Sequence, residues 1–320
     1  KTCPAPKILR NGQFLPVTGN SDCKNYIHEP VVSIHIDSES QTMFYHWWAS
    51  WASIRGHWAQ QLQSSRKIHI LIDVMTDPMF FNYFGLISNN CWRRAQTQIP
   101  ADTCFCDGHR FSASQTRSDT KKSVELMTNF FGLEGTVPPE KRVRIGLISR
   151  RKKRFILNEY ELVDAVIAMG YECILLPLEA MTIYEQTREL RTLDVLIGIH
   201  GSALDNSVFL HKGSVMVQLL PYKVEHRVTF KSSAVAAGIR YMEWQLKDKT
   251  KAYFHWDLLD QADSNKLKRM SKDAILNAGQ ITADNRETVM FWINQDIIVP
   301  LDEWKSLVIA AVQASPASKR

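Results

Sequence analysis

The residues best suited to chemistry lie in segment 194–210, DVLIGIHGSALDNSVFL. Its apolar start, DVLIGI, reads as a short strand that runs into His200–Gly201–Ser202 and then into an amphipathic stretch opened by small residues able to cap a helix. A strand that ends in a glycine turn and feeds a helix points free backbone N–H groups beyond its carboxyl end. The segment therefore predicts a seat for an anion.

A second group with chemical potential is the basic run Arg150–Arg154, which follows the strand-like segment 142–149, RVRIGLIS. A run of charges is by itself typical of a solvated loop. If both strands belong to one parallel sheet, however, the carboxyl ends of the strands share an edge, and the basic run lies across from the anion seat. Arginines and backbone N–H groups together suit a diphosphate.

The elements that must position these residues alternate along the second half of the chain. Short apolar strands separated by helical patterns predict right-handed βαβ units and a parallel, Rossmann-like sheet. Ligands of such sheets bind beyond the carboxyl ends of the strands. The predicted strands are 142–149, 172–178, 194–199, 214–220 and 240–245, and the predicted helices are 158–169, 183–191, 203–210 and 224–237.

Two other uses of such a sheet are disfavoured. No G-x-G-x-x-G follows a strand, no Walker glycine–lysine loop occurs, and no acidic residue ends the second strand, which argues against a dinucleotide enzyme. A hydrolase is disfavoured because Ser202 lies only two residues after His200 and G-x-S-x-G is absent.

The first half of the chain has weaker patterns. Residues 31–37 and 67–74 read as strands, and 43–62, rich in Trp and His, reads as a buried helix. Its tryptophans favour an aromatic core, with a sugar-stacking platform as the alternative. At the other end, 286–297 and 301–313 read as helices broken at Pro300.

Composition sets the outer limits. With 320 residues, 45% of them hydrophobic and 22% charged, the chain can bury a sizeable core and is expected to form two domains. A net charge of +6, spread along the chain, argues against bulk nucleic-acid binding and leaves room for one local phosphate site. No run of eighteen apolar residues predicts a membrane span.

Six cysteines at irregular spacing do not form a zinc pattern. Cys3 and Cys23 bracket a start rich in Pro, Gly and Asn, so a disulfide between them is one prediction, and it would imply an oxidising compartment. Reduced, partly buried thiols in a cytosolic protein are the alternative.

Four motifs, in this order, carry a family resemblance: FYHWW, TCFCDGHRF, ISRRKKRFILNEYEL followed by GIHGSALDNSVFL, and a strand ending in QLLPY. Over roughly residues 41–245 they resemble glycosyltransferase family 61. The resemblance implies an α/β GT-B fold, with two Rossmann-like domains facing across a cleft. The expected divisions are 1–138 for the acceptor side, 139–285 for the donor, and 286–320 for C-terminal helices that cross back to the first domain.

The function implied is inverting transfer of xylose, N-acetylglucosamine or arabinose from a UDP-sugar to a hydroxyl of a glycan or glycoprotein. Arginines and a helix N-terminus would stabilise the leaving diphosphate, so neither a cofactor nor a divalent metal is expected. The chain has no D-x-D pair that would hold a metal. The resemblance implies these donor-binding residues: Arg150, Arg154, Asn158, His200, Gly201, Ser202, Ala203, Asn206, Gln218 and Tyr222.

Two departures from the family pattern leave the chemistry open. An acidic residue is expected where the chain has Gln218, and the candidate carboxylate base falls on Ser50. His46 is then the first candidate for the general base and Asp37 the second. The alternative function is a catalytically inactive nucleotide- or carbohydrate-binding protein on the same fold. If a signal or anchor precedes Lys1, the expected location is the lumen of the secretory pathway, and otherwise the cytoplasm.

Overall fold

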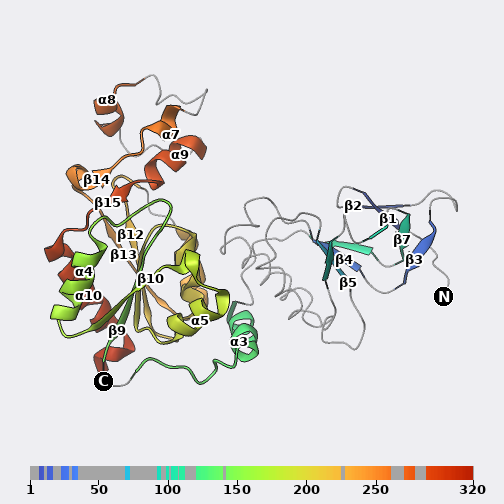
Figure 1. Ribbon diagram of the computed structural model, residues 1–320, viewed down its shortest axis with the longest axis horizontal. Helices are drawn as coiled ribbons and strands as arrows, with labels where there is room; N and C mark the ends of the chain where they lie inside the picture. The colour runs from blue at the N-terminus through green and yellow to red at the C-terminus, as the bar shows by residue number, and fades with distance from the viewer. Residues whose placement is uncertain are drawn as a thin grey trace. The chain divides into compact units, whose positions relative to one another are not determined.

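The chain forms two units, Lys1–Phe131 and Gly132–Arg320 (Figure 1). The computed structural model describes residues 7–10, 13–16, 23–28, 31–34, 69–72, 92–94, 99–100, 102–106, 108–111, 120–139, 142–224, 228–260, 270–277 and 286–319.

The division between the units falls a few residues before the boundary expected after residue 138. Segment 132–139 belongs with the second unit because its carbonyl groups are bound there. Arg191 Nη2 donates to Glu134 O at 3.4 Å, and His211 Nε2 contacts Thr136 O.

Five parallel strands form the sheet of the second unit, in the order β10-β9-β11-β12-β13. The predicted parallel sheet is confirmed. The order reverses between β9 and β11, so these neighbours mark the topological switch point, where ligands of open α/β sheets bind. The strands are β9 (Arg144–Ile148), β10 (Glu172–Leu176), β11 (Val195–Ile199), β12 (Val215–Leu220) and β13 (Arg240–Gln245).

Helices cover both faces of this sheet, with α4 and α10 on one side and α5 on the other (Figure 1). Every residue of β11 and β12 is buried, as expected for strands covered on both faces. The connecting elements are α4 (Glu159–Ala168), α5 (Ile183–Arg191), the 3-10 helix η3 (Ser202–Phe209) and α6 (Val228–Ala236).

Helix α5 shows why the sequence begins a helix at this point. Thr182 accepts a hydrogen bond from the Glu185 amide through its side chain, and the Glu185 carboxylate accepts one from the Thr182 amide. This capping box satisfies two amides that a helix start otherwise leaves unpaired. Arg188 and Arg191 lie in the last turn, where cations interact favourably with the helix dipole.

Helix α10 (Leu301–Ala314) packs its apolar face into its own unit, where Trp304, Leu307 and Val308 join the core of the five-stranded sheet. Its expected crossing to the first domain stays a prediction. Trp304 is fully buried, and its Nε1 donates to Leu162 O of α4 at 3.0 Å. Burying a large aromatic side chain contributes roughly 1.5–3 kcal/mol, which fixes α10 against α4.

The predicted helix 286–297 is shorter than expected. Helix α9 (Arg286–Ile293) ends first, and β15 (Asp296–Ile297) pairs antiparallel with β14 (Ala252–Tyr253). Extended backbone prevails there because it also bonds the loop before α4, through a parallel bridge between Ile156 and Ile297. The remaining elements are η2 (Leu178–Ala180), η4 (Lys249–Lys251), α7 (Asp257–Asp260), α8 (Lys272–Asn277) and η6 (Pro316–Lys319).

The first unit contains a parallel sheet, β6-β5-β4-β8, and a mixed sheet, β2-β1-β7-β3. The strands predicted in 31–37 and 67–74 are confirmed as β4 and β5, whereas the helix predicted over 43–62 lies outside the described residues. The elements are β1 (Lys7–Arg10), β2 (Gln13–Pro16), β3 (Asn25–Ile27), β4 (Val31–Ile34), β5 (His69–Ile72), β6 (Trp92–Arg94), β7 (Thr103–Phe105), β8 (Gly108–Phe111) and α3 (Thr120–Phe130).

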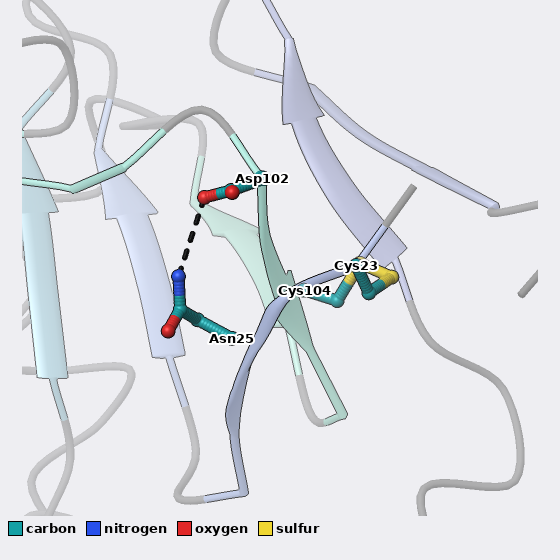
Figure 2. The surroundings of a disulfide bond; sticks show 4 residues. All are labelled: Cys23, Asn25, Asp102 and Cys104. Atoms are coloured by element: carbon teal, nitrogen blue, oxygen red, sulfur yellow. Dashed lines mark hydrogen bonds between the residues drawn. A yellow bond between two sulfur atoms is a disulfide. The ribbon is translucent and has the colours of Figure 1, made fainter. Parts of the chain in front are cut away.

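A disulfide joins Cys23 to Cys104, so the predicted Cys3–Cys23 pairing is wrong (Figure 2). The reason is tertiary: β3 and β7 pair in parallel, which brings residues far apart in sequence side by side. Asn25 Nδ2 donates to Asp102 Oδ1 at 3.2 Å beside the bridge (Figure 2). Cys106 is also disulfide-bonded, whereas Cys173 is a buried free thiol.

Candidate functional site

The site lies at the switch point of the five-stranded sheet, where β9 and β11 are neighbours. Ile145 pairs with Val195 and Leu147 with Ile197, so the two strands end side by side. Beyond them follow Ser149–Arg150 and His200–Gly201. The structure therefore brings together the basic run and the predicted anion seat, as the sequence predicted.

Two arginines converge on Gly201. A Cβ atom added to this glycine would lie 2.8 Å from Nη1 of Arg150 and 2.8 Å from Nη1 of Arg154. The two nitrogens are therefore no farther apart than twice that distance. Two like charges this close repel each other, and an anion between or beside them would offset the repulsion.

Arg154 is the buried member of the pair, with a relative exposure of 8%. Its Nε donates to Asn294 Oδ1 at 2.8 Å, and its Nη1 donates to His200 O at 3.0 Å. Burial, with a further contribution from Arg150, lowers the pKa of Arg154 to about 10, although Glu179 opposes the shift. The side chain stays cationic at neutral pH.

A carboxylate offsets the positive charge of Arg150 on the Nε side of its guanidinium group. Its Nε lies 2.8 Å from Glu179 Oε1, an ion pair in which the N–H direction is off the line of a hydrogen bond. Its Nη1 is buried and has no hydrogen-bond partner among the described residues. A buried donor without a partner is costly, so this nitrogen is available to an anion.

The rest of the basic run extends the positive charge toward solvent. Lys153 is exposed, but partial burial lowers the pKa of its ammonium group. The charges of Arg154 and Arg150 lower this pKa further, and the charge of Glu179 raises it. Arg151 faces Glu159, with its Nη1 3.7 Å from Oε1. Near this edge the cations therefore outnumber the carboxylates, which favours an anionic ligand.

The anion seat differs from the prediction in the type of its helix. Segment 202–209 is a 3-10 helix rather than an α-helix, and its first hydrogen bond runs from Leu204 N to Gly201 O. The amides of Ser202 and Ala203 precede that bond, as at any helix start. Of the small residues able to cap this helix, Gly201 occupies the N-cap position, and no side-chain cap bond forms.

Glycine at position 201 is explained by the space beside it and not by the glycine turn expected at the end of the strand. Its φ of 164° and ψ of 166° are extended backbone that any residue adopts, so no tight turn demands glycine. The missing Cβ instead leaves the space that the two guanidinium groups occupy. Gly201 is needed for close approach and not for backbone freedom.

His200 and Asn206 make contacts that hold the backbone of the anion seat in place. His200 is 8% exposed, its carbonyl accepts from Arg154, and its ring centroid lies 5.3 Å from that of Phe230. Asn206 is 2% exposed, and its Nδ2 donates to Ala203 O at 3.1 Å. These contacts fix the backbone around the strand end.

Gln218 is not brought to this edge. It lies in the middle of β12, paired with Gly198 and Glu243, and is 0% exposed. Neither atom of its amide has a hydrogen-bond partner among the described residues. Because β12 is covered on both faces, Gln218 is buried in the sheet before the strand ends, and its predicted contact with a ligand stays a prediction.

Tyr222 follows β12 and belongs to an aromatic cluster with Phe254, Phe291 and Trp292. Its ring lies edge-on to Phe254 with centroids 6.4 Å apart, and its carbonyl accepts from Gln295 Nε2 at 2.7 Å. The structure thus shows a packing role for this residue, and its role toward a donor stays a prediction.

Sequence reasoning missed two residues that hold the arginines, Glu179 and Asn294. Glu179 lies in η2, just after β10, and the only sequence signal for it was a carboxylate near the end of a predicted strand. Asn294 lies 140 positions from Arg154, and nothing in the sequence connects the two. Asn158, predicted to order the loop, holds Val299 by both its amide atoms.

Both candidates for the general base, His46 and Asp37, lie outside the described residues. No group of three His, Cys, Asp or Glu side chains within the described ranges is arranged to hold a metal ion. Likewise, no helix in the part of the chain that the structure describes is long and apolar enough to cross a membrane.

The family description Glycosyltransferase 61 matches residues 26–217, more than half of the chain. The chain belongs to the glycosyltransferase 61 family. The match includes Arg150, Arg154, His200 and Gly201, which the structure brings together. The resemblance inferred from the four sequence motifs is confirmed.

Three named relatives show which proteins this glycosyltransferase 61 chain is similar to. Alpha-1,3-arabinosyltransferase XAT2 of Oryza sativa subsp. japonica is 26% identical over 191 residues, 57% of this chain and 33% of that protein. The EGF domain-specific O-linked N-acetylglucosamine transferase of Drosophila melanogaster is 34% identical over 113 residues, 35% and 21% of the two chains. Protein O-linked-mannose beta-1,4-N-acetylglucosaminyltransferase 2 of Homo sapiens is 24% identical over 215 residues, 63% and 37%.

The chain thus covers between about a fifth and two fifths of the lengths of these relatives. Among solved structures, E. coli heptosyltransferase WaaC with ADP is similar at 10% identity with a TM-score of 0.39, covering 67% of this chain and 93% of that one.

Proposed function

We propose that this chain is an inverting glycosyltransferase that moves a sugar from a UDP-sugar to a hydroxyl of a glycan or glycoprotein. The observation that carries the proposal is the convergence of Arg150 and Arg154 on Gly201 at the switch point. Family membership supports the reaction class, because the relatives are named arabinosyltransferase and N-acetylglucosaminyltransferase. Xylose, arabinose and N-acetylglucosamine are the proposed sugars.

The chemistry follows from where charge develops. As the glycosidic bond to the sugar breaks, negative charge grows on the β-phosphate of UDP, and cations already fixed in place stabilise it without reorganising. Arg150 offers an Nη1 that has no partner among the described residues, and the first amides of η3 offer backbone donors. These groups supply positive charge of the kind that a divalent metal would supply, so we propose that transfer is metal-independent.

The acceptor side is proposed by analogy with the family. The acceptor hydroxyl must lose a proton as it attacks, so a general base is required. His46 is the first candidate and Asp37 the second. We propose a GT-B arrangement in which the two units face each other across the donor, and the parallel sheet of each unit supports an α/β architecture on both sides.

The disulfide between Cys23 and Cys104 supports a location in the lumen of the secretory pathway. Disulfides persist in oxidising compartments and are rare in the cytosol. Peptide mapping of the protein purified from cells under non-reducing conditions tests this. Recovery of Cys23 and Cys104 as free thiols would contradict it.

The experiment that tests the function has two stages. A panel of UDP-sugars is first screened by thermal shift, because a ligand that binds only the folded state raises its apparent stability. UDP release is then measured with and without glycan acceptors. Arg150→Ala should weaken both signals strongly, whereas the matched control Arg151→Ala, an exposed neighbour paired with Glu159, should retain them.

The second candidate function is a nucleotide- or carbohydrate-binding protein that has lost its chemistry. Gln218 in place of an acidic residue and Ser50 in place of a carboxylate favour it. Such a protein would bind a UDP-sugar and release no UDP with any acceptor. A complete lack of both nucleotide and carbohydrate binding would contradict both functions.

A further inference from the structure

The second half of the loop that carries the arginines, residues 154–158, is bonded to a distant segment, residues 294–299. The Phe155 amide donates to Asp296 Oδ1 at 2.8 Å, and the Phe155 carbonyl accepts from Ile297 N at 2.9 Å. Leu157 N then donates to Ile297 O at 2.8 Å. The loop is therefore held as an added strand and not as a free surface loop.

The end of the loop is fixed in the same way. Asn158 Nδ2 donates to Val299 O at 2.9 Å, and Val299 N donates to Asn158 Oδ1 at 3.1 Å. A side-chain amide that both donates to and accepts from one residue reproduces the pairing of a strand. The bonding to 294–299 thus continues to the start of α4.

The middle of the loop carries the constraint that matters for the site. Arg154 has a φ of 62°, a left-handed conformation that is uncommon for a residue with a side chain. Such a conformation is strained and persists only where its surroundings determine it. Those surroundings include Asn294, which is 4% exposed and accepts from Arg154 Nε at 2.8 Å.

Asn294 acts on the orientation of the guanidinium group. A guanidinium group is planar, so a hydrogen bond at Nε together with one at Nη1 fixes its plane. Asn294 provides the first bond and the His200 carbonyl the second. With Nε and Nη1 both bonded, the remaining Nη2 of Arg154 points in a defined direction.

We propose that Asn294 is a positioning residue for the donor site. The inference rests on the proposed function: Asn294 holds Arg154 beside Gly201 so that its charge is in place before the diphosphate arrives. An unfixed arginine would have to lose rotamer freedom on binding, which weakens affinity. Segment 294–299 thereby becomes part of the donor site, although it lies at the far end of the chain.

The test compares Asn294→Ala with a control of similar burial. Ser214 is 1% exposed, its Oγ donates to Leu193 O at 3.1 Å, and it precedes β12 at the opposite end of the sheet from the site. Ser214→Ala therefore reports what the loss of a buried hydrogen bond does by itself. Melting temperatures establish that both variants are folded and similarly destabilised.

The first measurement is UDP affinity by calorimetry. Asn294→Ala should weaken binding by about 10- to 100-fold, the factor that corresponds to one hydrogen bond to a charged group. Ser214→Ala should stay within about twofold of the unaltered protein, because it lies outside the site. Equal affinities for Asn294→Ala and the unaltered protein would overturn the positioning role, as would equal losses in both variants.

The second measurement does not need the nucleotide. In nitrogen-15-labelled protein, the Arg154 Nε–H should exchange slowly with water, lose that protection in Asn294→Ala, and recover it in Asn294→Asp, which keeps an acceptor oxygen. If the unaltered protein fails to bind UDP, the proposed function falls, while the exchange result still decides the positioning role. Slow exchange of Arg154 Nε–H in Asn294→Ala would refute the inference.

Discussion

Gly201→Ala tests the site with the smallest possible change. The added methyl carbon would lie 2.8 Å from Nη1 of both Arg150 and Arg154, whereas an ordinary contact is about 3.5 Å. Each guanidinium group must therefore move by several tenths of an ångström. The backbone contributes no strain, because its extended conformation suits alanine.

Gly201→Ala should reduce ligand affinity and turnover more than it reduces the stability of the fold. Overpacking costs about 1–3 kcal/mol of stability, and the ends of long side chains yield more easily than backbone. Displacement of preorganised charges is less forgiving, since an error of about 1 Å can reduce turnover about 10²-fold. We expect UDP affinity and kcat/KM to fall by about tenfold to hundredfold while the variant remains folded.

Two controls sharpen this experiment. Among the described residues, none has an atom within 4 Å of a Cβ added at Gly135, so Gly135→Ala should leave affinity and stability unchanged. If the methyl group acts through the arginines, adding Gly201→Ala to Arg150→Ala should cost less than it does alone, because only the contact with Arg154 remains. A folded Gly201→Ala that binds UDP normally, or fully additive effects in the double variant, would refute the steric argument.

Three other predictions follow from the site and its surroundings. Arg150→Ala should lower kcat by about 10²–10³, and Arg150→Lys should also be poor because a point charge cannot replace the planar group; a near-normal kcat in either would remove Arg150 from the site. A chelator should leave turnover nearly intact, and a loss that manganese restores would contradict metal independence. Burial lowers the pKa of His211 below 6.5, so the stability of the neutral ring is present above that pH and is lost as the pH falls through the lower value. The melting temperature should therefore fall on acidification less steeply in His211→Gln than in the unaltered protein, and equal slopes would exclude His211 as the cause.

Much of the second unit could be predicted from the sequence because its signals are local. Strands covered on both faces require continuous apolar runs, and β11 and β12 are such runs. Alternation with helical patterns then required a parallel sheet, and a parallel sheet brings the ends of its strands to one edge. Arg150 and Gly201 could for that reason be assigned to one site from the order of the predicted elements alone.

Only the tertiary structure decided how that site is held. The space beside Gly201 depends on two side chains from another loop, and the apolar run around Gln218 does not reveal that its amide is buried inside the sheet. The Cys23–Cys104 bridge depends on which strands pair, which spacing between cysteines cannot specify. Asn294 meets Arg154 across 140 residues, because folding can join any two surfaces that satisfy each other, and no local pattern in the chain records such a contact.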